Sequence, residues 1–301
     1  MTVRLEIPPA FAADVADRNG GAGRAWLRRL PHRVASLCDD WELVPEGPCW
    51  WGYCAIALPV RRADDSPAVV KVSWRGPDQA SEAPTLWAWA GDGAVRLLDH
   101  DPEHWALLLE RLDEGRDLTS VPVGAALEVI GSLLRRLHRA AVPAGVPSLT
   151  ATADRWAEEI PARWSAAEPP WPGRIRDEVV ATCRDLGGDS TSRLLHADLH
   201  FENVLAAERE PWLAIDPKGL AGDPAFEAWP VLWNRFEEYA GLRDVRRRLE
   251  AWCKGAGVDR DRARAWARVR TVEDAVDRLV TASEPERDVG VHRYLIDALS
   301  T

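Results

Sequence analysis

A short polar segment near residue 200 carries the side chains best suited to chemistry. It reads His196-Ala197-Asp198-Leu199-His200-Phe201-Glu202-Asn203 and follows the apolar pair Leu194-Leu195, which predicts a loop after a strand. A carboxylate on such a loop can accept a hydrogen bond from a substrate hydroxyl and direct its oxygen at a phosphorus atom, which is the role we predict for Asp198. Asn203 and Asp216 offer the hard oxygen ligands that Mg²⁺ prefers. This spacing predicts phosphoryl transfer.

Phosphoryl transfer also requires a cation over the nucleotide phosphates. Lys71 lies in Ala68–Ser73, a valine-rich run that predicts a buried strand, and it is one of only three lysines in the chain. A buried lysine costs free energy unless its charge has a partner, and Glu82 on the next predicted helix can supply one. The alternatives are a lysine at the strand edge with its head in solvent, and Glu82 as a solvated helix residue.

The elements needed to position these residues divide into two groups. Before Leu112 the hydrophobic patterns predict a small, strand-rich part, with helices at Gly23–Leu37 and Ser81–Ala90 and strands at Trp41–Val44, Cys54–Val60, Ala68–Ser73, Ala94–Leu98 and Trp105–Glu110. After it the pattern is mostly helical, with helices at Val123–Ala140, Asp154–Trp164, Arg174–Leu186 and from Ala225 onward, and short strands at Val204–Ala206 and Trp212–Ile215.

We therefore predict an α+β, bilobal fold. Residues 1–111 form the N-terminal nucleotide-binding lobe with its leading helix, and residues 112–301 form the helical lobe with the catalytic loop and acceptor site. A cleft between two lobes is a favoured place for a ligand.

Composition narrows the class of protein. The chain has 301 residues and a formal net charge of −10, which argues against a nucleic-acid partner and favours a cationic ligand, or else serves only solubility. The sequence shows neither a signal peptide nor a membrane-spanning run. Its five cysteines are an odd number without a Cys-x-x-Cys pair, so we expect neither disulfides nor zinc, and a cytoplasmic location. Independently of these features, we take a monomer as the working oligomeric state.

Several longer stretches resemble the catalytic core of eukaryotic-like kinases and, more closely, the aminoglycoside phosphotransferases. The similarity is greatest to the streptomycin 6-kinase and hydroxyurea kinase branch, and the stretches that carry it are residues 91–101, 107–112, 195–205, 212–219 and 222–224. The resemblance implies a kinase-like fold that uses ATP and Mg²⁺. It implies that Asp198 is the catalytic base, that Asn203 and Asp216 hold Mg²⁺, that Lys71 and Glu82 form the phosphate-binding ion pair, and that the backbone of Glu110 and Leu112 pairs with adenine.

Two departures from the kinase pattern stand out. Asp216-Pro217-Lys218 replaces Asp-Phe-Gly, so the switching of protein kinases is not expected. The segment expected to cover the phosphates, Glu46 to Tyr53, is not a G-x-G-x-x-G, because it has only Gly47 and Gly52 with two tryptophans between them. It is either the nucleotide loop or an ordinary hairpin tip.

The acceptor is expected to be small. Only seven positions separate Asp216 from Asp223, and no Ala-Pro-Glu follows, so no long activation segment is present to organise a protein substrate. Acidic and aromatic residues that could line a pocket for a cationic acceptor are Asp223, Glu227, Trp229, Trp233, Glu238, Glu273, Asp274 and Asp277. The alternatives are a core tryptophan pair, a solvated acidic helix face at 273–277, and Asp223 as the cap of a helix that opens at Pro224.

These features predict an ATP-dependent O-phosphotransferase acting on a small molecule. The first hypothesis is an aminoglycoside such as streptomycin, which would give antibiotic resistance or self-protection. A second is a kinase for hydroxyurea or another small hydroxylated metabolite. A hypothesis of another class is a nucleotide-binding pseudokinase that acts as an interaction module, suggested by the unusual phosphate loop.

Overall fold

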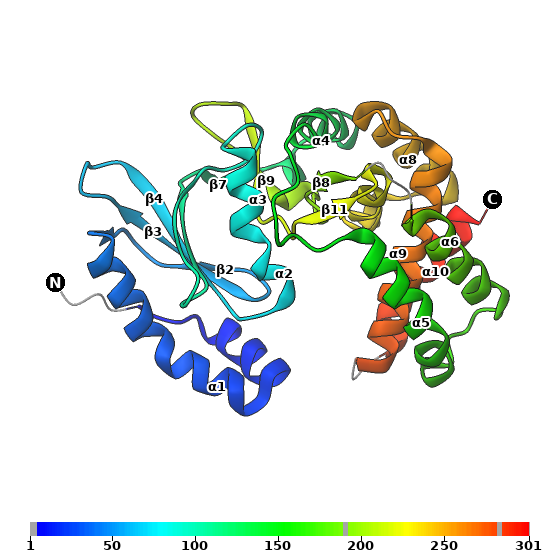
Figure 1. Ribbon diagram of the computed structural model, residues 1–301, viewed down its shortest axis with the longest axis horizontal. Helices are drawn as coiled ribbons and strands as arrows, with labels where there is room; N and C mark the ends of the chain where they lie inside the picture. Colours follow the sequence, from blue (N-terminus) through cyan, green and yellow to red (C-terminus); the bar gives the residue numbers. More distant parts are fainter. Residues whose placement is uncertain (1–4, 189–191, 282–284, 301) are drawn as a thin grey trace. The chain divides into compact units, whose positions relative to one another are not determined.

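The protein is described here by a computed structural model that covers residues 5–188, 192–281 and 285–300 (Figure 1). Its backbone contacts divide it into two compact units. The first runs up to Gly91 and includes Val95–Leu112, and the second comprises Asp92–Ala94 and the chain from Asp113 onward. The division at Leu112 lies one residue from the predicted boundary, whereas the sequence did not indicate that residues 92–94 belong to the second unit.

The first unit is built on an antiparallel sheet with the strand order β1-β3-β4-β6-β5, and β2 pairs with β3 at one side. Its elements are α1 (Pro9–Asp40), β1 (Val44–Pro45), β2 (Trp50–Trp51), β3 (Ala55–Arg61), β4 (Pro67–Ser73), α2 (Pro77–Ala80), α3 (Glu82–Trp89), β5 (Leu97–Asp101) and β6 (Ala106–Glu110).

Helix α1 covers this sheet with one apolar face (Figure 1). Trp26, Leu30, Val34 and Leu37 recur at helical spacing and are buried in the same core as the inward residues of β3, β4 and β6. The predicted helix at 23–37 is thus confirmed, but it begins earlier, at Pro9, and the helix bends at Gly20, where φ is 54°. Glycine adopts this left-handed conformation without the steric cost that a Cβ would bring.

Two predicted strands of the first unit were misplaced. Trp41 and Glu42 form a turn, with Glu42 at a φ of 52°, so only Val44–Pro45 remains as a strand. The strand predicted from Ala94 begins instead at Leu97, because Gly91 and Gly93, both with positive φ, turn the chain before it.

The second unit is mainly helical, with α5 packed on α6 and α9, and α10 packed on α8 and α9. Its helices are α4 (Val123–Leu137), α5 (Leu149–Ala167), α6 (Arg174–Gly187), α7 (Trp229–Trp233), α8 (Leu242–Ala256), α9 (Arg260–Thr281) and α10 (Pro285–Leu299). Short 3₁₀ helices are η1 (Leu118–Ser120), η2 (Phe201–Asn203), η3 (Pro224–Ala228) and η4 (Phe236–Glu238). Among the residues that the structure describes, no helix is long and apolar enough to cross a membrane.

Two small antiparallel ladders frame the polar segment near residue 200. One has the order β10-β9-β7 and the other pairs β11 with β8, and their strands are β7 (Asp113–Asp117), β8 (Arg193–Leu195), β9 (Val204–Ala206), β10 (Trp212–Ala214) and β11 (Leu220–Gly222). Val204 is paired with Ala214, and Leu195 with Leu220. Since the loop from β8 to β9 and the loop from β10 to β11 join the same two ladders, residues 196–203 and 215–219 are held side by side.

Gly222 allows the second ladder to lie against α5. A Cβ built at this position would lie 2.4 Å from the Cβ of Leu149, which is shorter than any real contact between such atoms. Any larger residue would push α5 away from the strand that follows the Asp216 loop.

Candidate active site

Lys71 lies in β4, in the interior of the sheet of the first unit. It is paired with Ala57 of β3 on one side and with Leu107 of β6 on the other. Its Nζ is 2.6 Å from Oε1 of Glu82 at the start of α3, and the two side chains are only 13% and 4% exposed. The ion pair expected from the sequence is present, and the alternatives of an edge lysine and a solvated Glu82 do not fit this burial.

The expected adenine-binding residues end the last strand of that sheet. Glu110 is the final residue of β6, its N–H donates to the Arg96 carbonyl at 2.9 Å, and its carboxylate accepts the Arg96 N–H at 3.1 Å. Leu112 follows as the last residue of the first unit.

The segment proposed to cover the phosphates forms a hairpin. The Gly52 N–H donates to the Ala55 carbonyl at 3.0 Å, which closes the turn between β2 and β3. Gly47 and Gly52 are exposed, and a Cβ at either would meet nothing within 4 Å, while Trp51 and Tyr53 are 50% and 79% exposed. The geometry is therefore that of a hairpin tip with exposed rings, and a role as phosphate loop stays a prediction.

In the second unit, Asp198 lies in the loop between β8 and η2. Its carbonyl accepts the side-chain N–H of Asn203 at 2.9 Å, and its carboxylate Oδ2 is 3.1 Å from Nζ of Lys218. The Lys218 N–H in turn donates to the His196 carbonyl at 2.9 Å. The carboxylate is thus held on the loop with a cation beside it.

His196 fastens this loop to the strand that leads to Asp216. Its Nε2–H donates to the Ile215 carbonyl at 2.8 Å, and its Nδ1 accepts the Asp198 N–H at 3.3 Å, which defines the neutral tautomer. The ring is fully buried, and this burial lowers the pKa of His196 despite the nearby carboxylates of Glu227 and Asp198.

Glu227 also fixes this loop, through hydrogen bonds to its backbone. Its side chain is completely buried, and its Oε1 accepts the N–H groups of His196 at 2.6 Å and Ala197 at 2.9 Å, while Oε2 accepts Nε2–H of His138. Burial alone would raise the pKa of this carboxyl, but the charge and hydrogen bond of His138 and the Ala197 N–H outweigh it and hold the pKa below its ordinary value. The prediction that Glu227 contacts the acceptor does not fit this position, because no ligand can reach it.

Asn203 and Asp216 lie next to each other at one end of the β9–β10 hairpin. The Ile215 N–H donates to the Asn203 carbonyl at 2.9 Å, and Asp216 follows with a left-handed φ of 57° and an exposed side chain. One amide and one carboxylate oxygen fit Mg²⁺, which takes few protein ligands and completes its shell with water and phosphate oxygens. Within the described ranges, no group of three or more His, Cys, Asp or Glu residues could hold a metal.

Asp223 is structural. Its Oδ1 accepts the Ala225 N–H at 2.9 Å and so caps η3, and its Oδ2 accepts from Arg262 at 2.6 Å and from the Trp266 indole at 3.0 Å. The capping alternative describes this residue, and its role as an acceptor ligand does not fit, since both oxygens are engaged and the side chain is buried.

The two candidate tryptophans stack on each other. The Trp229 and Trp233 rings are 5.7 Å apart at 19°, with Trp229 buried and Trp233 37% exposed. Arg270 lies 4.7 Å from the Trp229 ring, and Arg278 lies 5.9 Å from that of Trp233. Trp229 is thus a core residue, and only Trp233 presents a ring at the surface.

The other acidic candidates are paired with arginines. Glu238 binds Arg235 at 2.5 Å, Glu273 and Asp277 bind Arg163 at 3.0 and 2.7 Å, and Asp274 binds Arg278 at 2.8 Å and His292 at 2.6 Å. The cluster at 273–277 is therefore neither a simple solvated face nor a set of unneutralised carboxylates. Burial raises the pKa of Glu273 in spite of Arg163.

Comparison with known proteins identifies the family. A family model described as aminoglycoside/hydroxyurea antibiotic resistance kinase matches residues 40–280. The chain belongs to this family. It is 41% identical over 277 residues to a streptomycin 6-kinase of Streptomyces glaucescens, covering 90% of both chains. It is 40% identical over 302 residues to a hydroxyurea phosphotransferase of Kitasatospora aureofaciens, covering 96% of this chain and 85% of the relative.

Solved structures confirm the kinase-like fold of this family member. A spectinomycin phosphotransferase in complex with ADP and spectinomycin matches with a TM-score of 0.57 and 13% identity, covering 90% of this chain and 97% of that one. An aminoglycoside phosphotransferase in a ternary complex with ADP and hygromycin B matches with a TM-score of 0.59 and 16% identity, covering 88% and 97%. The predicted α+β kinase-like fold is thus confirmed. The phosphotransferase class is confirmed by the sequence relatives.

Three residues of this kinase were not predicted from the sequence to belong to its site. Lys218 reaches Asp198, and His138 of α4's C-terminal cap holds Glu227. Arg270 interacts electrostatically with Asp198. Burial lowers the pKa of Arg270, and the negative charge of Asp198 partly opposes this change. For Lys218 a signal existed, since it is one of three lysines and lies two residues after Asp216.

Proposed function

We propose that this kinase transfers the γ-phosphoryl group of ATP to a hydroxyl of an aminoglycoside, with streptomycin as the first candidate. The observation that carries the proposal is the arrangement at Asp198, whose loop is tied down by His196 and Glu227 and whose carboxylate lies beside Lys218. The similarity to streptomycin 6-kinases supports the choice of acceptor.

Each residue then has a role in one substitution reaction. The Asp198 carboxylate accepts the hydrogen bond of the acceptor hydroxyl and directs its oxygen lone pair at the γ-phosphorus. The new O–P bond forms as the bond from the γ-phosphorus to the β,γ-bridging oxygen breaks, and the hydroxyl proton leaves through Asp198. Lys218 places a positive charge next to the carboxylate, where it can bind a γ-phosphate oxygen and offset the charge that develops there.

Lys71 binds the α- and β-phosphates in this proposal, and Glu82 keeps its ammonium in place. Asn203 and Asp216 hold Mg²⁺, which when bound neutralises phosphate charge and orients the phosphates. The backbone of Glu110 and Leu112 binds adenine, and Gly47 and Gly52 belong to the loop over the phosphates.

The acceptor, in this proposal, rests against the exposed Trp233 ring and carboxylates that retain solvent access, such as Asp277, which is 58% exposed beside Arg163. A cationic acceptor can exchange with the arginines that neutralise Glu238, Glu273 and Asp274. Five free cysteines fit a reducing cytoplasm, which we propose as the location of a monomeric enzyme.

Hydroxyurea is the second candidate acceptor, because a hydroxyurea phosphotransferase is almost as similar to this chain as the streptomycin kinases are. The two candidates separate in a coupled ADP-release assay with streptomycin, hydroxyurea, spectinomycin or no acceptor. We expect turnover with streptomycin well above the rate without acceptor. Turnover with hydroxyurea alone would transfer the proposal to that acceptor, and no stimulation by any of them would overturn the acceptor class.

A further inference from the structure

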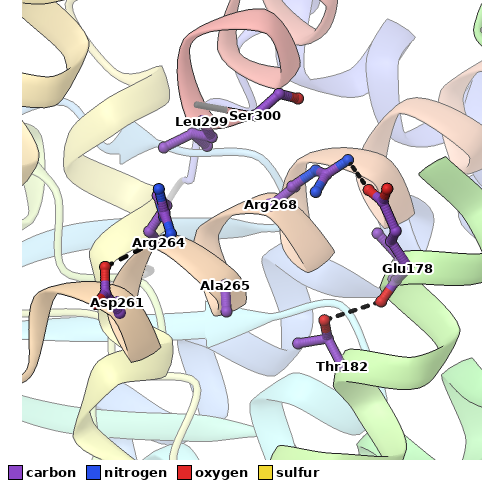
Figure 2. A pocket seen from close by; sticks show the side chains of 9 residues that line it. Glu178, Thr182, Asp261, Arg264, Ala265, Arg268, Leu299 and Ser300 are labelled. Carbon is purple, nitrogen blue, oxygen red and sulfur yellow. Dashed lines mark hydrogen bonds and ion pairs between the residues drawn. The ribbon is translucent and has the colours of Figure 1, made fainter.

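A cavity lies in the second, mainly helical unit, and the proposed active site uses none of its lining residues. It has a volume of about 540 Å³ and is bounded by the loop between α5 and α6, the start of α6, and one side each of α9 and α10. A smaller hollow of about 150 Å³ adjoins it and shares Glu178, Arg268 and Ser300 with it (Figure 2). The residues that give the larger cavity its chemical character are Trp171, Arg174, Ile175, Arg268, Arg293 and Asp297.

The cavity meets the positive end of a long helix. Helix α6 begins at Arg174, and its N-cap, Gly173, has no side chain that could accept a hydrogen bond from the first turn. Arg174 and Ile175 of that turn line the cavity. Backbone N–H groups at a helix N-terminus carry partial positive charge, so this wall favours an anion. Two contacts reduce the effect: the Ile175 N–H already donates to the Pro172 carbonyl at 3.0 Å, and Asp177 of the same turn, paired with Arg176 at 2.7 Å, adds a negative charge.

Two hydrogen-bond donors of the cavity wall are buried and without an acceptor in the part of the chain that the structure describes. Trp171 is only 9% exposed, and its indole N–H has no partner. The same holds for Nε–H of Arg268, whose Nη2 reaches Glu178 (Figure 2). A buried donor without a partner costs free energy, so a small shift of the wall that brings either donor to an acceptor atom of a ligand would be favoured.

The charges of the wall favour the same class of ligand. Arg174, Arg268 and Arg293 come from three different elements, and they face two carboxylates, Glu178 and Asp297. Glu178 is already paired with Arg268. The charged residues that line the cavity therefore carry a net positive charge, although the whole chain has a net charge of −10. Beside the arginines, Trp171 and Ile175 line the cavity; both are largely buried, so each contributes only a small apolar edge.

We propose that this cavity binds a small organic oxyanion, a carboxylate or a phosphate monoester attached to an apolar or aromatic body. The oxyanion lies against Arg174, Arg293 and the first turn of α6, and the apolar body lies on Trp171 and Ile175. A guanidinium pairs with either oxyanion in a bidentate manner, which is why both kinds remain within the class. This site is independent of the acceptor that the kinase phosphorylates.

Isothermal titration of the whole chain with phenyl phosphate, benzoate, inorganic phosphate and phenol at constant ionic strength tests the proposal. We expect one molecule of phenyl phosphate or benzoate to bind per chain. Inorganic phosphate should bind more weakly, and phenol should not bind. Whichever aromatic anion binds more tightly identifies the oxyanion. Binding should persist when ADP and streptomycin, which cannot react with each other, are both present at saturating concentration, and this separates the cavity from the active site.

Variants assign the binding to this cavity. Arg174→Gln and Arg293→Gln lie on different helices, and each should weaken binding about tenfold, as expected for one lost charge-assisted hydrogen bond. Trp171→Phe keeps an aromatic side chain but replaces the indole by a smaller ring without the N–H donor, and it should weaken anion binding severalfold. Arg243→Gln, an exposed arginine on α8, is the matched control and should leave affinity unchanged. The proposal is overturned if neither aromatic anion saturates the protein at millimolar concentration, if ADP displaces the anion, or if both arginine variants, folded by circular dichroism, bind like the parent chain.

Discussion

Replacing Glu227 with alanine tests whether the buried carboxylate holds the catalytic loop. The change removes the acceptor of the His196 and Ala197 N–H groups and the partner of His138. No side chain remains to satisfy these donors, and Asp198 lies only one residue beyond Ala197. The variant should therefore be less stable than the parent chain, and its Asp198 carboxylate should be displaced.

The hydrogen bonds and the ion pair that Glu227→Ala removes determine the expected loss of stability. A hydrogen bond to a charged group contributes about 1.5–3 kcal/mol, so two backbone bonds give a ceiling of about 3–6 kcal/mol. Removing one partner of a buried ion pair costs about 3–5 kcal/mol, and we adopt that range for Glu227→Ala. At roughly 2–4 °C per kcal/mol, the melting temperature should fall by about 6–20 °C. A displacement of the catalytic carboxylate by about 1 Å is enough to lower kcat about 100-fold.

Differential scanning calorimetry and the coupled ADP-release assay measure these two effects, with kcat taken well below the melting temperature of the variant. Glu227→Gln keeps one oxygen for the two N–H groups and should be intermediate in both. Glu250→Ala, at an exposed position on α8, is the control and should match the parent chain. A Glu227→Ala protein that melts within about 2 °C of the parent and keeps kcat within threefold would refute the anchoring role.

Four further predictions follow from the contacts described. Lys218→Met should lower kcat about tenfold, because a charge 3.1 Å from Asp198 contributes about 1.3 kcal/mol even at the dielectric constant of water, and it should raise KM for ATP, because the proposed contact with the γ-phosphate is lost. Lys218→Arg should retain most activity, and equal loss in both variants would contradict a role of the charge. Lys71→Met and Glu82→Gln should both raise KM for ATP, measured by initial rates, and an effect of Lys71→Met alone would show that Glu82 does not position the lysine. The folded protein lowers the pKa values of His196 and Glu227, so on acidification the unfolded chain binds more protons than the folded one. The free energy of unfolding should therefore fall below about pH 6.5 for His196 and below about pH 4.5 for Glu227, by up to about 1.4 kcal/mol per pH unit for each group. A free energy of unfolding in urea that stays level from pH 7 to 5 would contradict the His196 contribution. Burial raises the thiol pKa of Cys38 to about 11 and those of Cys183 and Cys253 to about 12, and it raises the pKa of the buried Cys49 as well. Among the five cysteines, only the half-buried Cys54 should therefore react quickly with a thiol reagent at pH 8 in peptide mapping, and fast labelling of Cys183 would show that α6 opens.

Much of the fold was predictable from local pattern. The helix predicted from Val123 is α4, because its apolar residues recur with the period of a helix. The strand at Val204–Ala206 also has the predicted bounds, and it is a short, uninterrupted apolar run. Strand β7 was not predictable in this way. Its sequence, Asp-Glu-Gly-Arg-Asp, is almost entirely charged, and it is extended only because it pairs with β9, a contact made about 90 positions later in the chain.

The candidate site also contains residues that the sequence predicted and contacts that it could not predict. The spacing of Asp198, Asn203 and Asp216 led us to predict a shared site, and two short ladders set the backbone positions of the loops that carry them. Their catalytic and metal-binding roles stay a prediction. Glu227 was assigned to the acceptor because sequence does not tell a buried glutamate from an exposed one. The fully enclosed carboxylate and its bond to His138 of the α4 cap, 89 positions away, depend on tertiary packing. The arginines that pair with Glu238, Glu273 and Asp277 were missed for the same reason.

Phosphorus NMR of the product formed from ATP and streptomycin, by the parent chain and by Asp198→Ala, tests the central claim most directly. The account predicts one new phosphate monoester on streptomycin, formed in equal amount to ADP by the parent chain and nearly absent with Asp198→Ala, although that variant still binds ATP. ADP release without a monoester, or monoester formation by Asp198→Ala at the parent rate, would contradict it.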